Sequence, residues 1–481
     1  MNRQITQLFG VVLVLFTLLV VFTSRWTVFE AKSLQNQTAN KRPLLEQLQI
    51  PRGFIFAGDG TKLAVNKRSG HGPTLRYSRV YPTNNLFSHA VGYSFISQGS
   101  AGLEKKYNDD LAGNSNEFSS IIDELSGQKK VGNDLYTTLD PAAQRLALQL
   151  LGNQAGSVVV LDPRDGAVRV MASVPNYNPN DIPERSRQLN TDKAAPLFNR
   201  ATQGGYPPGS TMKVVTASAA LDSGRYTPNS VVSGKSPKIL GGVPLSNCCT
   251  EGSGNYGPLT LTEALAKSVN TVWGEVGEKL GKKTMFEYMN RFGFDKKPQL
   301  DLPSDELGVS GVYGSHGQLL GPSDAIDIAR VAIGQERLRV SPLQMAEVAA
   351  TVANGGKLMK PRLVERIESP DGRVIDKRGP AEIDQVMKES TAQQVTAMME
   401  QVVKAGTATA AQIPGVTVAG KTGTAEVANG TANQAWFIAF APVPNPRVAI
   451  AVTIERTQGE GGTVAAPIAK QVIEQLLGKG G

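Results

Sequence analysis

The sequence has few of the side chains that most often perform acid–base and metal chemistry. It has three histidines and two cysteines in 481 residues, and Cys248 and Cys249 are adjacent. With no distant cysteine, they form no disulfide framework and are either thiols or a strained vicinal bridge. No Cys-x-x-Cys pair and no His/Cys cluster occurs, which argues against bound zinc, and no cofactor is expected. A Ser-His-Asp triad has little support, because only His316 lies outside the amino-terminal part.

Other absences exclude whole classes of protein. With 40% hydrophobic and 19% charged residues, the composition is that of a globular protein without wholesale disorder. No internal repeat is visible, and no dense Lys/Arg tract is interleaved with aromatic residues, so no nucleic-acid partner is expected. The formal charge of +8 suits an anionic neighbour such as a membrane surface or an acidic wall polymer, or serves solubility alone.

No charged residue occurs between Arg3 and Arg25, where LFGVVLVLFTLLVVF fills the middle. About twenty such residues can span a bilayer as a helix. A cleaved signal peptide is the alternative, but TSRWTVFEAKSL offers a poor small-residue cleavage site. We therefore expect an uncleaved single-pass anchor in the cell membrane with the long carboxyl part on the extracytoplasmic side. The flanking charges are nearly balanced, so this orientation depends on the chemistry of the remaining chain.

The length predicts two or more domains. We expect a short cytoplasmic tail and anchor at 1–25, a linker and pedestal or interaction domain at 26–136, and a catalytic domain at 137–481. In the pedestal, GFIFAGDGTKLAV is typical of a hairpin around an AGDGT turn. His71 and His89 also lie there without a partner signature, and each is expected to be a surface or packing histidine.

From Ala143 onward the pattern predicts an α+β domain. GSVVVLDPRDGAVRVMASV is typical of two strands joined by a DPRDG turn, and VTVAGKTGTAEVA, AWFIAFAPVP and RVAIAVTIE predict three more strands near the end. Helices are expected after Ser210 and at LTEALAKSVNTVWGEVGEKLG, SDAIDIARVAIG, SPLQMAEVAATVANGG and IAKQVIEQLL, the first of these four with a Thr260–Glu263 capping box. The sheet should therefore join the first and last segments of this region.

The segment GGYPPGSTMKVVTASAAL places Ser210 three residues before Lys213, directly after a Pro-Pro-Gly turn. If a helix begins at or just before Ser210, both side chains lie on one face and the serine lies at the positive end of the helix. A serine needs a base, and Lys213 is the nearest one. To act so, a lysine must be desolvated or lie near other cations, which lowers its pKa to roughly 7–8.

Ser-x-x-Lys alone is a weak signal, since Ser126 and Lys129 form a second one. Ser268-Val-Asn270 is equally weak by itself, because Ser253-Gly-Asn255 is a rival. Lys421-Thr422-Gly423 is rarer and lies between strand-like runs. The order carries the information: Ser-x-x-Lys leads a helix, Ser-x-Asn follows within a helical stretch, and Lys-Thr-Gly lies on a strand. That order is the signature of the penicilloyl-serine transferases.

The resemblance extends beyond the three motifs. The chain resembles a monofunctional class B penicillin-binding protein, a peptidoglycan D,D-transpeptidase, of the short actinobacterial penicillin-binding protein A type. PRGFIFAGDGTKLA, RVYPTNNLFSHAVGY and AGLEKKYNDDLAG resemble the family's amino-terminal segments, although the usual Asp-Arg-Asn-Gly is here Ala-Gly-Asp-Gly. NRATQGGYPPGSTMK, ARVAIGQERLRVSPLQMA and GKTGTAE resemble its transpeptidase domain. The resemblance covers nearly the whole chain after the anchor. It implies a transpeptidase domain whose antiparallel sheet is flanked by helices, and a smaller non-catalytic α+β domain.

The resemblance also implies roles for individual residues. Ser210 would be the acylated nucleophile and Lys213 its base, while backbone N–H groups of Ser210 and Thr424 would form the oxyanion hole. Ser268 and Asn270 would relay a proton to the leaving amine and hold the substrate amide. The residues implied to line the sheet edge and bind the substrate's terminal carboxylate are Lys421, Thr422, Gly423 and Thr424. No role is assigned to Glu426.

The implied reaction is serine-type acyl transfer on the D-Ala–D-Ala end of a peptidoglycan stem peptide. D-Alanine leaves, and the amine of a neighbouring stem resolves the ester on Ser210 to form a cross-link. β-Lactams would acylate the same serine and leave slowly. The expected setting is cell-wall synthesis, in cell division or cell shape, with division or elongation proteins as partners, including a polymerising glycosyltransferase.

Four alternatives share parts of this pattern. A D,D-carboxypeptidase or β-lactamase lets water resolve the ester, but soluble β-lactamases are shorter, and no clear deacylating glutamate is present. A bifunctional class A protein needs a glycosyltransferase domain, for which the stretch from Trp26 to Tyr136 is too short. A penicillin sensor has little cytoplasmic tail with which to signal. A wall-binding scaffold with a dead site conflicts with the complete motifs.

Overall fold

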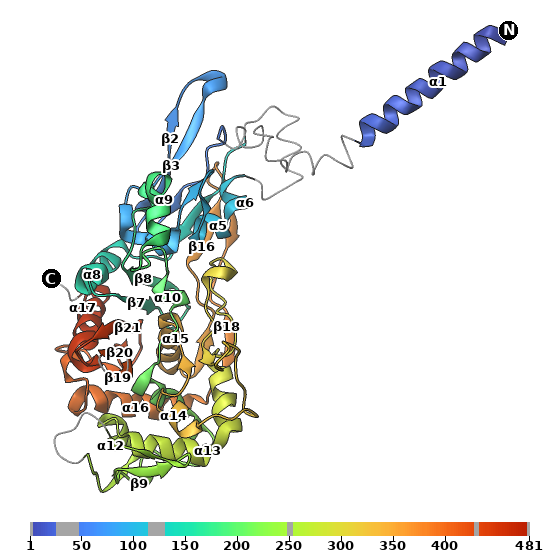
Figure 1. Ribbon diagram of the computed structural model, residues 1–481. Coiled ribbons are helices and arrows are strands. Elements are labelled where there is room, and N and C mark those ends of the chain that lie inside the picture. Colours follow the sequence, from blue (N-terminus) through green and yellow to red (C-terminus); the bar gives the residue numbers. More distant parts are fainter. Residues whose placement is uncertain (1–2, 26–47, 114–129, 248–253, 428–431, 479–481) are drawn as a thin grey trace.

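The computed structural model describes residues 3–25, 48–113, 130–247, 254–427 and 432–478. Figure 1 shows an elongated body of two lobes, each built around a sheet. The helix α1 (Arg3–Ser24) has no buried residue and a mean hydropathy of 2.6. Within the described ranges it is the one helix long and apolar enough to cross a bilayer. Cys248 and Cys249 and the linker at 26–47 lie outside the described residues.

The carboxyl-terminal lobe is built on a five-stranded antiparallel sheet in the order β19-β20-β21-β7-β8. The last three strands of the chain pair with the first two of the lobe through β21 and β7. The strands are β7 (Gly156–Leu161), β8 (Val168–Val174), β19 (Ala419–Val427), β20 (Ala432–Ala441) and β21 (Val448–Thr457). The prediction of an α+β domain whose sheet joins its first and last segments is confirmed.

Helices pack on both faces of this sheet, so its strands are apolar on both sides. α15 (Pro342–Ala353) packs on β7, β20 and β21, while α8 (Pro141–Leu151) and α17 (Ala466–Leu476) lie on the other face (Figure 1). α16 (Glu389–Ala405) runs against the edge strand β19 and against α11 (Lys213–Asp222). α11 is buried along nearly its whole length, which explains its apolar sequence.

The other helices of this lobe are α9 (Ile182–Thr191), α10 (Arg200–Gln203), α12 (Leu261–Ala266), α13 (Asn270–Arg291) and α14 (Ile328–Val331). The expectation that SDAIDIARVAIG is helical is wrong for most of its length. Asp327 accepts a hydrogen bond from the N–H of Arg330 and starts the helix late, and Gly334 at φ 79° follows soon after its end.

The amino-terminal lobe contains a six-stranded sheet in the order β17-β16-β6-β1-β2-β3. The hairpin predicted around AGDGT is confirmed as the antiparallel pair β1–β2. Two strands come from residues 364–377, far beyond the boundary expected near residue 136, so both parts of the chain build one sheet. The strands are β1 (Ile55–Phe56), β2 (Lys62–Ser69), β3 (Arg76–Val80), β6 (Asp134–Thr137), β16 (Val364–Glu368) and β17 (Val374–Lys377).

Short elements complete both lobes. In the amino-terminal lobe they are α4 (Ser88–Val91), β4 (Ser94–Phe95), β5 (Gly99–Ser100), α5 (Gly102–Lys106) and α6 (Asn108–Leu111). Two-stranded pairs elsewhere are formed by β9 (Val231–Ser233), β10 (Lys238–Leu240), β11 (Val243–Leu245), β12 (Pro258–Thr260), β13 (Gly311–Val312), β14 (Leu338–Arg339), β15 (Lys357–Met359) and β18 (Glu382–Gln385).

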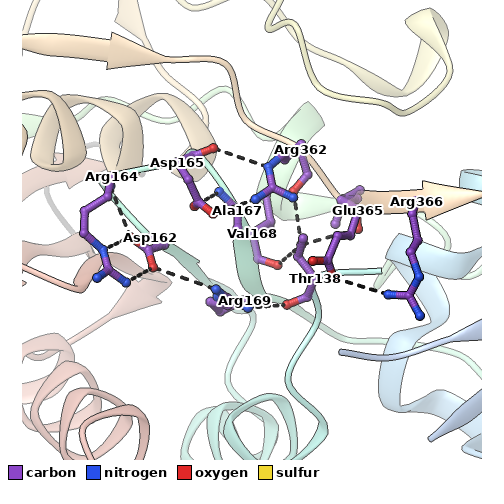
Figure 2. Close-up of polar contacts among 11 residues, drawn as sticks. Thr138, Asp162, Arg164, Asp165, Ala167, Val168, Arg169, Arg362, Glu365 and Arg366 are labelled. Atoms are coloured by element: carbon purple, nitrogen blue, oxygen red, sulfur yellow. Dashed lines mark hydrogen bonds and ion pairs between the residues drawn. The ribbon is translucent and has the colours of Figure 1, made fainter. Parts of the chain in front are cut away.

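The DPRDG turn between β7 and β8 connects the two lobes (Figure 2). Arg362, just before β16, donates to Oδ2 of Asp165 at 2.5 Å, and the N–H of Val168 donates to the carbonyl of Arg362 at 2.9 Å. Thr138, just after β6, donates through Oγ1 to the carbonyl of Val168 at 2.7 Å. The five-stranded sheet is thereby bound to both segments that enter or leave the six-stranded sheet.

Candidate active site

Ser210 lies in a 3₁₀ turn, Gly209–Met212, that continues directly into α11. The helix expected at or just before Ser210 is therefore present, with a tighter first turn. Gly209 has φ 53°, and a Cβ there would lie 2.8 Å from the carbonyl oxygen of Thr424. Pro207 accepts a hydrogen bond from Nε1 of Trp436 at 2.9 Å. These contacts hold the serine turn close to β19. Only glycine at position 209 allows the two backbones to approach so closely.

Lys213 is fully buried on the first turn of α11. Its Nζ donates to the carbonyl of Ser268 and to Oδ1 of Asn270, each at 2.7 Å, and lies 3.3 Å from Oγ of Ser268. The first and second motifs, 55 residues apart between Lys213 and Ser268, thus meet directly.

Ser268 does not lie inside a continuous helix, as the sequence pattern suggested. α12 ends at Ala266 and α13 begins at Asn270, and Ser268 between them has φ 57°, in the left-handed region. Such a conformation costs about 1–3 kcal/mol for a residue other than glycine. In return it aims the carbonyl of Ser268 at the amine of Lys213, which a helical serine could not do because its carbonyl would be bonded within the helix.

The third motif reaches the same hydroxyl. Lys421 is fully buried on β19, and its Nζ donates to Oγ of Ser268 at 2.9 Å and to the carbonyl of Thr422 at 2.9 Å. Oγ of Ser268 therefore lies between two amines, 3.3 Å from Lys213 and 2.9 Å from Lys421. Because β19 is the edge strand of its sheet, its free side can face the serine turn.

The other predicted residues of the strand have distinct surroundings. A Cβ on Gly423 would lie 2.7 Å from the carbonyl oxygen of Pro208, so this glycine permits the contact between strand and turn. Oγ1 of Thr424 accepts from the N–H of Gly461 at 3.3 Å, and Thr424 is half-buried. Oγ1 of Thr422 lies 2.5 Å from Oγ1 of Thr407, and Thr422 is only 6% exposed.

Sequence reasoning missed several residues that hold this arrangement. A Cβ on Gly334 would lie 1.9 Å from the carbonyl oxygen of Gly209, and one on Gly461 would lie 2.1 Å from that of Trp436. Thr407 supports Thr422. The one available signal was the single Gly334 after the apolar run VAI, which indicates close backbone approach but not the partner.

The histidines lie apart from this cluster. His316 is exposed and its Nδ1 lies 3.2 Å from Oγ of Ser315. His89 is a buried packing residue, as expected, with Nε2 2.9 Å from the carbonyl oxygen of Pro196 and its ring edge-on to Tyr177. Within the described ranges, no group of three or more His, Cys, Asp or Glu residues could hold a metal ion.

The loop before the two cysteines borders the second motif. Nδ2 of Asn270 donates to the carbonyl of Ser246 at 3.3 Å, and the N–H of Thr271 donates to Oδ1 of Asn247 at 2.9 Å. The segment that leads into Cys248 therefore contacts the start of α13.

Residues 156–474 match the family described as penicillin binding protein transpeptidase domain, and residues 52–135 match the penicillin binding protein A dimerisation domain. The chain is 33% identical to the peptidoglycan D,D-transpeptidase PbpA of Mycolicibacterium smegmatis, with 100% of both chains covered. The imipenem acyl-enzyme of penicillin-binding protein A from M. tuberculosis has a TM-score of 0.79 and 31% identity, with 90% of this chain and 100% of that chain covered. Its penicillin G acyl-enzyme has a TM-score of 0.78 and 32% identity, with 89% and 100% covered.

Family matches, full-length relatives and solved structures agree with each other and with the three motifs. The chain therefore belongs to the penicillin-binding protein transpeptidase family, as a class B peptidoglycan D,D-transpeptidase of the penicillin-binding protein A type.

Proposed function

We propose that Ser210 attacks the carbonyl of the D-Ala–D-Ala bond in a peptidoglycan stem peptide. The C–N bond breaks, D-alanine leaves with the proton lost by the serine, and an ester remains on Ser210. The amine of a second stem then attacks the ester, which restores the serine and completes a cross-link. The observation that carries this proposal is the hydroxyl of Ser268 lying between the amines of Lys213 and Lys421.

Lys213 has the surroundings of a general base. Its Nζ lies within hydrogen-bond distance of the carbonyl of Ser268 and of Oδ1 of Asn270, each at 2.7 Å, and of Oγ of Ser268 at 3.3 Å. These oxygens can hold the ammonium that forms when Lys213 takes a proton. Full burial and a second ammonium on the same hydroxyl both disfavour the charged form.

Ser268 connects the base to the leaving group. Its Oγ accepts a hydrogen bond from Lys421 at 2.9 Å and from Lys213 at 3.3 Å. When the substrate nitrogen leaves, Ser268 gives it a proton and takes one from Lys213. Lys421, with its positive charge on the edge strand, then favours the terminal carboxylate of the stem peptide, helped by Thr422, Gly423 and Thr424.

The oxyanion hole is proposed at the contact between the serine turn and β19, from the N–H groups of Ser210 and Thr424. The contact of Gly209 with the carbonyl of Thr424 supports this, because the two backbones lie side by side there. One such donor is worth roughly 3 kcal/mol in the transition state.

We further propose that α1 anchors the enzyme and that its catalytic lobe lies on the extracytoplasmic side, where the substrate is. We also propose a division of function along the chain. Residues 1–25 form the tail and anchor, residues 26–136 form the linker and a pedestal that docks partners, and residues 137–481 form the catalytic domain. The expected role is cell division, together with a polymerising glycosyltransferase that supplies uncross-linked strands.

The full chain in detergent is incubated with a fluorescent penicillin and run on a denaturing gel. Ser210→Ala should reduce labelling by at least about a thousandfold, since the acylated atom is missing. Ser126→Ala, in the second Ser-x-x-Lys, is the matched control and should keep the label. Mass spectrometry that places the adduct on another residue contradicts the proposal, and fast loss of the label indicates a β-lactamase.

A second assay separates cross-linking from hydrolysis. A stem peptide ending in D-Ala–D-Ala is supplied with an acceptor amine, and D-alanine and the cross-linked product are measured together. Equal amounts of both support the transpeptidase. D-Alanine without cross-linked product indicates that water resolves the ester, as in a carboxypeptidase.

A further inference from the structure

The β2–β3 hairpin is a basic projection that the proposed reaction does not use. β1 pairs with β2 only as far as Ala64, and β2 and β3 continue as a two-stranded ribbon beyond the sheet (Figure 1). From Lys62 to Val80 the sequence has five Lys or Arg residues and no Asp or Glu. The five are Lys62, Lys67, Arg68, Arg76 and Arg79.

The cations at the base of the ribbon contact other residues of the amino-terminal lobe. Arg79 is buried and donates to Oε1 of Glu104 at 2.5 Å, and Nζ of Lys62 lies 5.4 Å from the centre of the Phe54 ring. Farther out, Lys67 and Arg68 are exposed, and neither has an acidic partner among the residues that the structure describes. The described lobe therefore does not neutralise the charges of Lys67 and Arg68.

Cations lie on both faces of the outer ribbon. The register pairs Lys67 with Ser78, Arg68 with Tyr77 and Ser69 with Arg76. Because successive side chains of a strand alternate between faces, Lys67 and Arg76 share one face and Arg68 lies on the other. Charge on both faces suits an end-on approach to a planar anionic layer better than flat docking on one protein surface.

The described chain resumes beside this ribbon after the anchor and the linker. The N–H of Tyr77 donates to the carbonyl of Leu48 at 2.7 Å. Leu48 is the first described residue after Arg25, and this point of the chain contacts the outer ribbon before the chain enters either sheet. The ribbon projects from the end of the molecule opposite α12 and β9 (Figure 1).

We propose that the ribbon tip, residues 66–78, binds anionic lipid headgroups of the membrane that holds α1. The inference rests on the proposed anchoring role of α1. Lys and Arg side chains near such a surface are attracted to its phosphates, and the attraction falls off within a Debye length of about 8 Å at physiological salt. The contact holds the pedestal end at the bilayer and directs the catalytic lobe away from it.

The full chain is reconstituted in nanodiscs of phosphatidylcholine alone and in nanodiscs with equal phosphatidylcholine and phosphatidylglycerol. Hydrogen–deuterium exchange of the ribbon-tip amides is measured in both. Exchange should be roughly tenfold slower on the anionic discs, and this protection should disappear at high salt. Equal exchange on the two lipids overturns the proposal.

Lys67→Glu/Arg68→Glu should remove the lipid-dependent protection, and Lys283→Glu/Lys296→Glu, at two exposed lysines of the other lobe, should keep it. Labelling by penicillin at the parent level shows that each variant is folded. If the parent chain itself is not labelled, that result counts against the proposed reaction and not against the lipid contact. If a soluble anionic wall polymer slows exchange on phosphatidylcholine discs while phosphatidylglycerol does not, the partner is the polymer and the lipid proposal is wrong.

Discussion

At the scale of single residues, the site depends on close backbone contacts around the serine turn. Gly209, Gly334 and Gly423 stand where a Cβ would lie within 3 Å of a neighbouring carbonyl oxygen. The three glycines thereby set the distance between Ser210 and the edge strand. A misplacement of reacting groups by about 1 Å can cost a hundredfold in rate.

Gly423→Ala should therefore slow acylation by penicillin by about a hundredfold while the protein stays folded. The new Cβ would lie 2.7 Å from the carbonyl oxygen of Pro208 and must move the strand away from the turn. The measurement is the second-order rate of labelling by a fluorescent penicillin. Gly379→Ala, where a Cβ meets nothing within 4 Å, is the control. An unchanged rate in Gly423→Ala would mean that the strand accommodates the methyl group without displacement.

His89 links stability to pH. Burial, helped by the charge of Arg200 and opposed by the bond to Pro196, lowers its pKa from 6.5 to about 4. The unfolded chain thus binds a proton between these values that the folded chain does not, so stability falls as pH falls from 6.5 to about 4. The contribution is about 3 kcal/mol by the bottom of this range.

His89→Gln should remove this part of the pH dependence, because glutamine does not titrate. Thermal unfolding midpoints of both proteins are compared between pH 7 and 4, and their difference should shrink or change sign as the pH falls. His71→Gln, at an exposed histidine, should follow the parent chain. Parallel pH profiles of His89→Gln and the parent would contradict the assignment.

At the scale of elements, function depends on where helices and strands end. The interruption between α12 and α13 gives Ser268 a carbonyl free for Lys213, and the edge position of β19 leaves Lys421 facing the same point. The three motifs could be recognised in the sequence from their order alone. The break at Ser268 could not, because LTEALAKSVNTVWGEVGEKLG has no proline to mark it and a left-handed serine is stabilised only by a tertiary contact.

The β7–β8 turn should also matter for stability. Arg362→Ala removes the pair with Asp165, whose side chains are 12% and 25% exposed, and should lower the free energy of unfolding by about 2 kcal/mol. Arg373→Ala removes a pair with Asp371 whose side chains are 80% and 56% exposed, and it should leave the free energy of unfolding nearly unchanged. Denaturant unfolding measures both. Equal losses would show that the turn does not bind the lobes together.

At the scale of the whole molecule, α1 is separate from the catalytic machinery. None of its residues is buried, and its apolar surface has no partner in the described lobes. A chain without residues 1–25 should therefore appear in the soluble fraction and be acylated by penicillin at the parent rate. Fractionation and gel labelling check the two expectations separately. A large loss of acylation would show that the anchor supports the fold.

The sequence by itself determined the α+β class, the apolar span, most strands and helices, and the family. These follow from local periodicity, turn residues and motif order, which are written in neighbouring positions. Only the tertiary structure decided that Ser268 stands between two lysines and that β16 and β17 complete the amino-terminal sheet. Lys421 is 153 residues from Ser268, and no local pattern specifies a contact at that separation. Such contacts arise from packing helices on both faces of one sheet, which draws distant segments to a common edge.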